Sequence, residues 1–245
     1  MSTYTQPTRR AALMIMTGGV VSACAPQITE IESPIPGSNL PPEVLRRYDQ
    51  IEDDGRIIPA VNPAYLKPHL VRQEVPFDTS RPVDSIVVDP FNHALYLVLG
   101  GGRALRYGVA VGDAGRNFRG GATISRKQHW PSWTPTANMI RREPNVYGPF
   151  AGGVPGGLDN PLGARALYLY RNGRDTYYRI HGTSQPWSIG MSVSSGCIRL
   201  YNQDIIDLYE RVPNGTRVHV MSRTESDARF AQQSAAMPGE MDAGL

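Results

Sequence analysis

The chain has 245 residues, of which 40% are hydrophobic and 19% are charged, so it carries enough apolar side chains for one domain of ordinary size and is not expected to be wholly disordered. Its 25 glycines and 21 prolines argue against an all-helical bundle and favour a strand-rich protein with many loops. The formal charge is only +3 and the basic residues form no block, so nucleic acid is not expected as a partner.

The first 23 residues have the organisation of an export signal peptide. The pair Arg9-Arg10 precedes an apolar stretch over residues 11–21, which is too short to cross a hydrocarbon core of about 30 Å as a helix. The arginine pair resembles a twin-arginine export signal, and ordinary secretion is the alternative.

One of the two cysteines of the chain, Cys24, follows this signal directly. Residues 21–24, Val-Ser-Ala-Cys, resemble the lipobox of bacterial lipoproteins, in which the cysteine is lipidated and becomes the new N-terminus. The resemblance implies an exported protein of the periplasm or cell envelope that a lipid on Cys24 holds at a membrane. A signal peptide that is cut nearby without lipidation is the alternative.

Residues 24–82 are interpreted as a proline-rich arm. Nine prolines and no sustained period of 2 or 3.6 predict either an extended tether or an arm that lies along the surface of the domain. One short helix is expected near residues 43–50, after two consecutive prolines.

Residues 83–222 carry the patterns of one folded domain. Runs of β-branched and aromatic residues, bounded by glycine, proline and asparagine, predict a meander of strands, then a hairpin and a last strand. The expected strands cover residues 85–89, 94–99, 104–111, 166–170, 176–181 and 216–220.

One amphipathic helix is expected in this domain. Asn202 is placed as its N-cap, and the helix stops before Pro213. Its apolar face is formed by Ile205, Leu208, Tyr209 and Val212. The domain is therefore expected to be mainly β with one packed helix, and residues 223–245 are expected to be a frayed polar tail.

Neither a metal nor a cofactor is expected. The five histidines show no spacing of paired metal ligands, and the chain has no Cys-x2-Cys pair. The glycine-rich stretch over residues 152–157 is not followed by Lys-Ser/Thr, so it is interpreted as a flexible loop and not as a phosphate site.

The strongest indication of chemistry is a histidine and a cysteine 16 positions apart. A thiol attacks carbonyl groups as the thiolate, and an imidazole can take its proton and later deliver it to a leaving amine. His181 stands in His-Gly-Thr, and Cys197 in Ser-Ser-Gly-Cys-Ile-Arg-Leu. Strand alternation places Arg179 and His181 on one face and Ile180 on the other, so we expect His181 to emerge at the end of a strand if Ile180 faces the core.

The residues around Cys197 can assist such a reaction. Gly196 allows close backbone approach, and the amides of Ser195, Gly196 and Cys197 can form an oxyanion-binding nest. Arg199 offers a fork for a substrate carboxylate. The alternatives are a buried structural cysteine and a disulfide with Cys24, which lipidation of Cys24 would disfavour.

These motifs resemble the signature of the bacterial L,D-transpeptidase (YkuD) family. The resemblance covers roughly residues 84–221 and rests on the His-Gly-Thr and Ser-x-Gly-Cys-Ile-Arg motifs, on Ile189-Gly190, on Asp204 and on residues 212–218. It implies a β-sandwich-like catalytic domain in which Cys197 is the acylated nucleophile and His181 is the general base and acid. It also implies that the backbone carbonyl of Gly182 orients His181. Ser195 stands where the family often has a second histidine, which leaves His181 as the only candidate base.

The reaction is likewise implied by the resemblance. Cys197 would attack the bond between meso-diaminopimelate and D-Ala in a peptidoglycan stem tetrapeptide and release D-Ala. An amine of a second stem would then give a 3-3 cross-link, or an amine of a wall-attached partner would be joined to the wall. The resemblance also implies acylation of the thiol by carbapenems. The alternatives are a hydrolase of the same mechanism and a non-catalytic peptidoglycan-binding lipoprotein.

An aromatic stretch upstream is a candidate for substrate binding. Trp130 and Trp133 lie in a segment dense in aromatic residues and prolines, which we expect to line or cover the groove for the acyl donor. The alternative is a packed loop that braces the sheet.

Overall fold

The structure, a computed structural model, describes residues 39–112, 118–193 and 197–236. Strands dominate this part of the chain, so the prediction of a mainly β protein is confirmed. The expected signal peptide, Cys24 and the first part of the proline-rich arm lie outside the described residues, as do Ser195 and Gly196. Within the described ranges, no helix is long and apolar enough to span a lipid bilayer.

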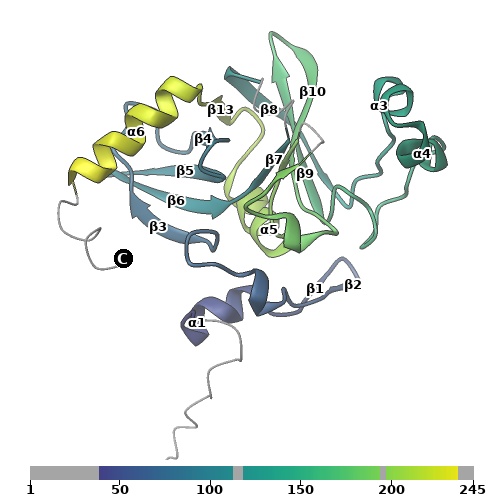
Figure 1. The fold of residues 1–245 in the computed structure, drawn as a ribbon, viewed down its shortest axis with the longest axis horizontal. Coiled ribbons are helices and arrows are strands. Elements are labelled where there is room, and N and C mark those ends of the chain that lie inside the picture. Colours follow the sequence, from purple (N-terminus) through teal and green to yellow (C-terminus); the bar gives the residue numbers. More distant parts are fainter. Residues whose placement is uncertain (1–38, 113–117, 194–196, 237–245) are drawn as a thin grey trace, which may run out of the picture. The chain divides into compact units, whose positions relative to one another are not determined.

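Most of the described strands belong to one mixed sheet with the order β11-β7-β12-β10-β9-β8-β13-β4-β5-β6-β3 (Figure 1). Its strands are β3 (Gln73–Pro76), β4 (Ile86–Asp89), β5 (Ala94–Gly100), β6 (Arg103–Gly108), β7 (Ala110–Gly112), β8 (Gly120–His129), β9 (Arg165–Arg171), β10 (Arg174–His181), β11 (Ser192–Val193), β12 (Ile198–Arg199) and β13 (Arg217–Val220). The pairs β10–β12, β11–β7 and β13–β4 are parallel, and the remaining pairs are antiparallel.

Each of the six predicted strand segments contains a strand. The long strand β8 was not predicted, because most of its residues are polar and its pairing with β9 and β13 determines its conformation.

The predicted strand over residues 104–111 is divided in two. β6 ends at Gly108 and β7 begins at Ala110. Gly108 faces the backbone of Leu70 so closely that a Cβ atom at this position would collide with the Leu70 carbonyl group. β6 and β7 stand near opposite ends of the strand order, yet only one residue separates them in the chain. The sheet must therefore fold back on itself, and its inner face encloses the main core.

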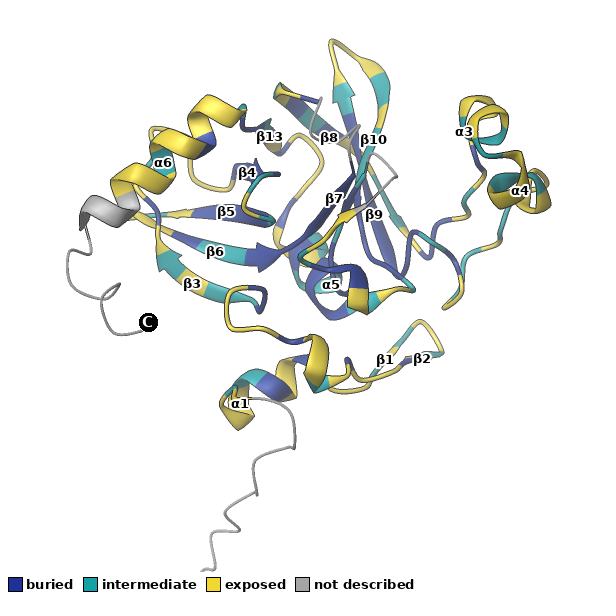
Figure 2. Ribbon diagram, in the orientation of Figure 1, coloured by how far each residue is buried: buried dark blue, intermediate teal, exposed yellow. Residues whose placement is uncertain are grey.

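This main core is formed by alternate residues of the strands. Leu167 and Leu169 of β9, Ile180 of β10 and Ile198 of β12 are at most 2% exposed and belong to it. Figure 2 shows β5, β7 and β9 buried along most of their length, so residues on their other face are covered as well. The burial of Ile180 confirms the predicted alternation at the end of β10.

Helix α5 (Asn202–Arg211) packs against β9 (Figure 1). Ile205 and Leu208 are fully buried, which confirms the predicted apolar face. The predicted capping is wrong: Tyr201 is the N-cap residue and no side chain caps the first turn. Asn202 is the first residue of the helix, and its side chain is bonded to other segments.

The segment over residues 39–76 lies against the domain. It is therefore not an extended tether but follows the other expectation, an arm that lies along the domain. Its elements are α1 (Pro42–Leu45), η1 (Arg46–Tyr48), β1 (Ile51–Asp53), β2 (Arg56–Ile58), η2 (Pro63–Tyr65) and β3. Tyr48, Leu70 and Val71 are at most 3% exposed and share a second hydrophobic cluster with Ile189 and Tyr201. Each short element contributes only one or two apolar residues, which is why the sequence shows no period.

Polar contacts fix this N-terminal segment as well. Arg165, which is buried, binds both carboxylate oxygens of Asp53 at 2.6 and 2.7 Å. Nε2 of Gln203 lies within hydrogen-bond distance of the carbonyl groups of Tyr48, Asp49 and Pro59, at 3.1–3.4 Å. The segment is therefore an integral part of the folded unit.

The expected frayed tail instead contains helix α6 (Arg223–Ala236). The Glu225 carboxylate accepts from the Ser222 amide at 2.7 Å, and the Ser222 hydroxyl accepts from the Glu225 amide at 3.3 Å, which is a capping box. Ser226 is buried and bonds the carboxylate of Asp89 at 2.9 and 3.0 Å, and Arg229 stacks on Phe77. Helix α6 is otherwise exposed along most of its described length (Figure 2).

An insertion between β8 and β9 carries the short helices α3 (Ala137–Arg142), α4 (Pro144–Tyr147) and η3 (Gly148–Phe150). The hydroxyl of Thr136 caps α3 by accepting from the Met139 amide at 3.2 Å. A further short helix, η4 (Pro186–Ser188), follows β10.

Candidate active site

The site is built on the parallel pairing of β10 with β12. Ile180 is opposite Ile198, and His181 is opposite Arg199. Both isoleucines point into the main core. Because side chains alternate between the faces of a strand, His181 and Arg199 project from the opposite, outer face of the sheet.

Cys197 joins this outer face. It directly precedes Ile198 of β12, and its neighbours include the backbone of Arg179 and the guanidinium groups of Arg179 and Arg199. One more residue in the register of β10 and β12 would set Cys197 opposite Arg179, on the side of the sheet that His181 and Arg199 share. An ideal strand spacing of about 4.8 Å and a rise of about 3.3 Å per residue would then give about 8 Å between the Cα atoms of Cys197 and His181. The cysteine and histidine that are 16 positions apart in the sequence are thus brought together on adjacent strands.

A β-bulge shapes the strand beside the cysteine. The register of β10 against β9 shifts between Asp175 and Arg179, and Tyr177 has a φ of +63°. The carboxylate of Asp175 can therefore bind the guanidinium of Arg179 with both oxygens, at 2.8 and 3.0 Å. Arg179 also stacks on Tyr168, at 4.5 Å from the ring centre.

The thiol of Cys197 is half-buried. Burial raises its pKa, whereas a hydrogen bond with the backbone of Arg179 and the positive charges of Arg179 and Arg199 act in the opposite direction. These effects do not cancel that of burial, so the pKa of the Cys197 thiol stays above its ordinary value and the group needs a base to reach the thiolate.

His181 is only 3% exposed, so it does not emerge openly at the strand end as the sequence suggested. Its Nδ1 lies 2.6 Å from the carbonyl oxygen of Gly182. Burial and the charge of Arg199 lower the pKa of His181 to about 3, against the effect of hydrogen bonds with the backbone of Gly182 and Leu162. The imidazole is therefore neutral at pH 7 and able to accept a proton.

Arg199 projects beside His181. Its NH1 group donates to the side-chain oxygen of Gln185 at 3.3 Å. Burial lowers the pKa of Arg199, and Tyr147 of the insertion is close enough to affect it electrostatically. Helix α4 thus lies near the cysteine-bearing strand, which the sequence did not indicate.

The two tryptophans occupy different environments. Trp130 is 8% exposed, packs against Ile58 and Ala164, and carries Arg56 over its ring, an environment that fits the alternative of a packed loop bracing the sheet. Trp133 is half-buried and lies 6.3 Å from the ring of Tyr147 and 6.2 Å from that of Phe150, measured between ring centres.

The sequence analysis gave no role to three residues that surround the arginines beside Cys197 or belong to them: Arg179 itself, Asp175, which binds Arg179, and Gln185, which binds Arg199. A regular strand would place Asp175 and Arg179 about 13 Å apart, and only the bulge brings them together. Within the described residues, no three His, Cys, Asp or Glu side chains are grouped so that they could hold a metal ion.

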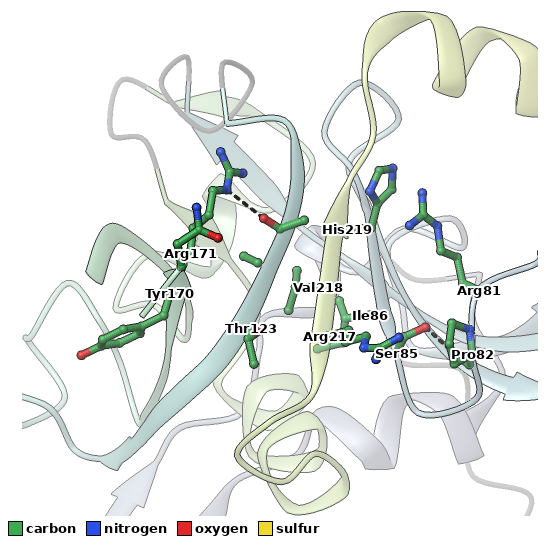
Figure 3. A pocket seen from close by; sticks show the side chains of 13 residues that line it. Arg81, Pro82, Ser85, Ile86, Thr123, Tyr170, Arg171, Arg217, Val218 and His219 are labelled. Atoms are coloured by element: carbon green, nitrogen blue, oxygen red, sulfur yellow. Dashed lines mark hydrogen bonds between the residues drawn. The ribbon is translucent and has the colours of Figure 1, made fainter. Parts of the chain in front are cut away.

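A surface groove lies farther along the sheet, where β4, β13, β8 and β9 adjoin (Figure 3). Arg81, Arg171, Arg217 and His219 contribute its basic side chains. Arg171 donates to two backbone carbonyl groups, and Glu225 contacts both His219 and Arg81. Cys197 and His181 do not line this groove.

A mainly β fold with a cysteine and a neutral histidine on neighbouring segments is the arrangement of a candidate cysteine-dependent enzyme. Comparison with known proteins identifies the family. The family model of YkuD, the L,D-transpeptidase catalytic domain, matches residues 84–220, which is more than half of the chain. The chain belongs to this family.

Individual relatives agree with this assignment. The probable L,D-transpeptidase ErfK/SrfK of Salmonella typhimurium is 40% identical over 149 residues, which cover 60% of this chain and 46% of that protein. The probable L,D-transpeptidase YcfS of Escherichia coli is 32% identical over 215 residues, which cover 77% of this chain and 66% of that protein. The chain spans 36–46% of the length of the first curated relatives that it matches.

Among solved structures, a protein of Brucella melitensis, named a probable carnitine operon oxidoreductase, is 51% identical to this chain. The match covers 64% of this chain and 98% of that chain, with a TM-score of 0.45.

Proposed function

We propose that the chain is an exported L,D-transpeptidase that uses the thiol of Cys197 to transfer acyl groups of peptidoglycan stem peptides. The observation that supports this proposal is the parallel pairing of β10 with β12, because His181 ends β10, Cys197 directly precedes β12, and the isoleucine next to each is anchored in the core. A structural cysteine would need neither a neutral histidine on the adjacent strand nor two guanidinium groups on the same face.

In the first half-reaction, His181 takes the thiol proton of Cys197. Since Nδ1 of His181 is directed at the carbonyl group of Gly182, Nε2 is the nitrogen assigned to this proton transfer. The thiolate attacks the carbonyl carbon between meso-diaminopimelate and D-Ala, the C–N bond breaks, and the imidazolium returns its proton to the leaving amine of D-Ala. The amides of Ser195, Gly196 and Cys197 are assigned to the oxyanion of the tetrahedral intermediate.

In the second half-reaction, an amine resolves the thioester on Cys197. His181 removes a proton from the attacking amine, the C–S bond breaks, and the thiol is restored. The acceptor is the diaminopimelate amine of a second stem, which gives a 3-3 cross-link, or an amine of a wall-attached partner. No step requires a cofactor.

The substrate is assigned to the outer face beside Cys197. Arg199 is placed to bind a carboxylate of the stem peptide, because its guanidinium projects next to His181. Trp133, with its neighbours Tyr147 and Phe150, is assigned to the wall of the donor groove. The electrostatic contact of Tyr147 with Arg199 supports this assignment.

The test combines purified protein with muropeptides that carry tetrapeptide stems, followed by mass spectrometry of the products. We expect new 3-3 dimers and free D-Ala from the wild-type protein and neither from Cys197→Ala, with the fold of the variant unchanged in its circular dichroism. A carbapenem is expected to add one covalent mass at Cys197, and none in the variant. Normal turnover by Cys197→Ala would refute the mechanism.

The same measurement separates the alternatives. Tripeptides without dimers would indicate that water resolves the thioester, as in a hydrolase of the same mechanism. Unchanged muropeptides and an unmodified thiol would indicate a peptidoglycan-binding protein without catalysis.

A further inference from the structure

Asn202 joins three segments of the chain through its carboxamide group. Oδ1 accepts from the amide of Ala164 at 3.0 Å and from the amide of Thr183 at 3.2 Å. Nδ2 donates to the carbonyl oxygen of Thr183 at 3.0 Å. Ala164 and Thr183 both lie outside helix α5, so the side chain connects the start of α5 to the approach to β9 and to the exit from β10.

Two glycines leave the space for this carboxamide. A Cβ atom on Gly163 or on Gly182 would collide with Oδ1 of Asn202. Gly163 also has a φ of +62°, a conformation that favours glycine. Both glycines are therefore required where the Asn202 carboxamide inserts.

One of the three segments holds the hydrogen bond that orients the histidine. The peptide group between Gly182 and Thr183 is planar, and its N–H and C=O point in opposite directions. Asn202 binds the N–H end of this peptide group, and Nδ1 of His181 binds the C=O end at 2.6 Å. Fixing one end of a rigid plane fixes the direction of the other.

We infer that Asn202 is a positioning residue for His181, because its carboxamide sets the orientation of the Gly182–Thr183 peptide plane to which the imidazole is bonded. This inference rests on the proposed function, in which His181 accepts the proton of Cys197. It assigns to the start of α5 a role in proton transfer that is separate from the packing of the helix.

The test measures how fast iodoacetamide alkylates Cys197 between pH 5 and pH 10. Peptide mass mapping of the full chain separates Cys197 from Cys24. Alkylation proceeds through the thiolate, and a correctly placed neutral imidazole speeds it at neutral pH by taking the thiol proton as the sulfur attacks. A general base increases a reaction rate on the order of 100-fold. In Asn202→Ala the imidazole of His181 is misplaced but still present, so we expect the alkylation rate at pH 7 to fall by only about tenfold. The pH of half-maximal rate should move up toward that of His181→Ala.

The second variant, Asn202→Asp, keeps an oxygen that can accept from both amides. We expect its rate at pH 7 to stay within about threefold of the wild type, and its half-maximal pH to lie at or below the wild-type value, since a carboxylate near the imidazole favours the imidazolium. This variant also provides a test if Asn202→Ala does not fold.

Gln203→Ala is the matched control. Gln203 is the next residue of the same helix, and its side-chain amide likewise lies within hydrogen-bond distance of three backbone carbonyl groups, but they belong to the N-terminal segment. We expect Gln203→Ala to lower Tm and to keep the wild-type pH profile.

A wild-type profile in Asn202→Ala, or equal shifts in Asn202→Ala and Gln203→Ala, would overturn the inference. Failure of the proposed function has a different signature, namely identical profiles for the wild type and His181→Ala.

Discussion

Asp204 is a buried carboxyl group at which the N-terminal segment meets helix α5. It is fully buried, and the hydroxyl of Tyr48 donates to it at 3.1 Å. The same hydroxyl accepts from the amide of Arg72 at 2.5 Å, and the guanidinium of Arg72 lies 3.9 Å from Asp204. Burial raises the pKa of Asp204 to about 7, although Arg72 and Tyr48 act in the opposite direction.

This pKa predicts how stability depends on pH. Between the ordinary carboxyl pKa near 4 and a folded-state pKa of about 7, the folded state holds a proton that the unfolded state has released, so stability falls as the pH rises through this range. Compared with Asp204→Asn, the wild-type free energy of unfolding should fall by about 2–3 kcal/mol from pH 5 to pH 7.5. Urea unfolding of both proteins at the two pH values measures this difference. A constant difference would show that Asp204 does not titrate in this range.

At the residue scale, the sequence pointed to His181 and Cys197 as the candidate catalytic pair, because the residue types and neighbours in their motifs are specific. Their protonation behaviour depends on Arg179, Arg199 and the degree of burial, and these follow from the tertiary structure. Trp130 shows the same dependence, since an aromatic side chain can line a groove or fill a core and only its neighbours decide which.

At the scale of elements, the N-terminal segment connects to the site through Leu70. Leu70 is 2% exposed. Its backbone lies against Gly108 at the end of β6, and its methyl groups occupy the space that a Cβ atom on Gly190 would need. Gly190 donates to the carbonyl group of Val109, next to β7, and β7 pairs with β12, which begins directly after Cys197. The segment therefore supports the strands that adjoin Cys197.

Leu70→Ala should accordingly destabilise the whole folded unit. Removal of a buried leucine side chain costs about 2–5 kcal/mol, because the cavity that remains adds to the lost burial of apolar surface. Ile57→Ala is the control in the same segment, since Ile57 is 57% exposed and its truncation should change the free energy of unfolding by less than about 0.5 kcal/mol. Chemical denaturation gives both values. Equal effects of the two substitutions would show that the segment lies loosely on the domain.

Helix α6 illustrates the limits of pattern reading at this scale. Its residues are mostly polar, and the sequence analysis interpreted them as a frayed tail. Two local features could have indicated a helix: Ser222 and Glu225 at the spacing of a capping box, and the alanines that follow. The contact of Ser226 with Asp89 joins residues 137 positions apart and has no local signal.

At the scale of the whole molecule, the two cysteines are assigned separate roles. We propose that Cys24 carries a lipid that holds the exported protein at a membrane, while Cys197 acts on the wall polymer. The proposal for Cys24 rests on the sequence of residues 21–24, which lie outside the described structure.

Metabolic labelling with a palmitate analogue tests this arrangement. The wild-type chain should incorporate the label and sediment with membranes, whereas Cys24→Ala should lose both properties. Cys197→Ala is the control, and it should be labelled like the wild type because the two cysteines lie in separate parts of the chain. Retained label in Cys24→Ala would refute lipidation at this residue.

The sequence by itself determined the mainly β class, most of the strands, the apolar face of α5 and the pair of residues proposed for catalysis. These features are local, because alternation, helical periodicity and short motifs depend only on residues that are close together in the chain. The tertiary structure alone decided that the sheet folds back at Val109, that residues 39–76 are part of the folded unit, and that Asn202 binds two distant segments in place of capping its own helix. Each of these depends on contacts between residues far apart in the chain, whose energies come from burial and hydrogen bonding that no local pattern records.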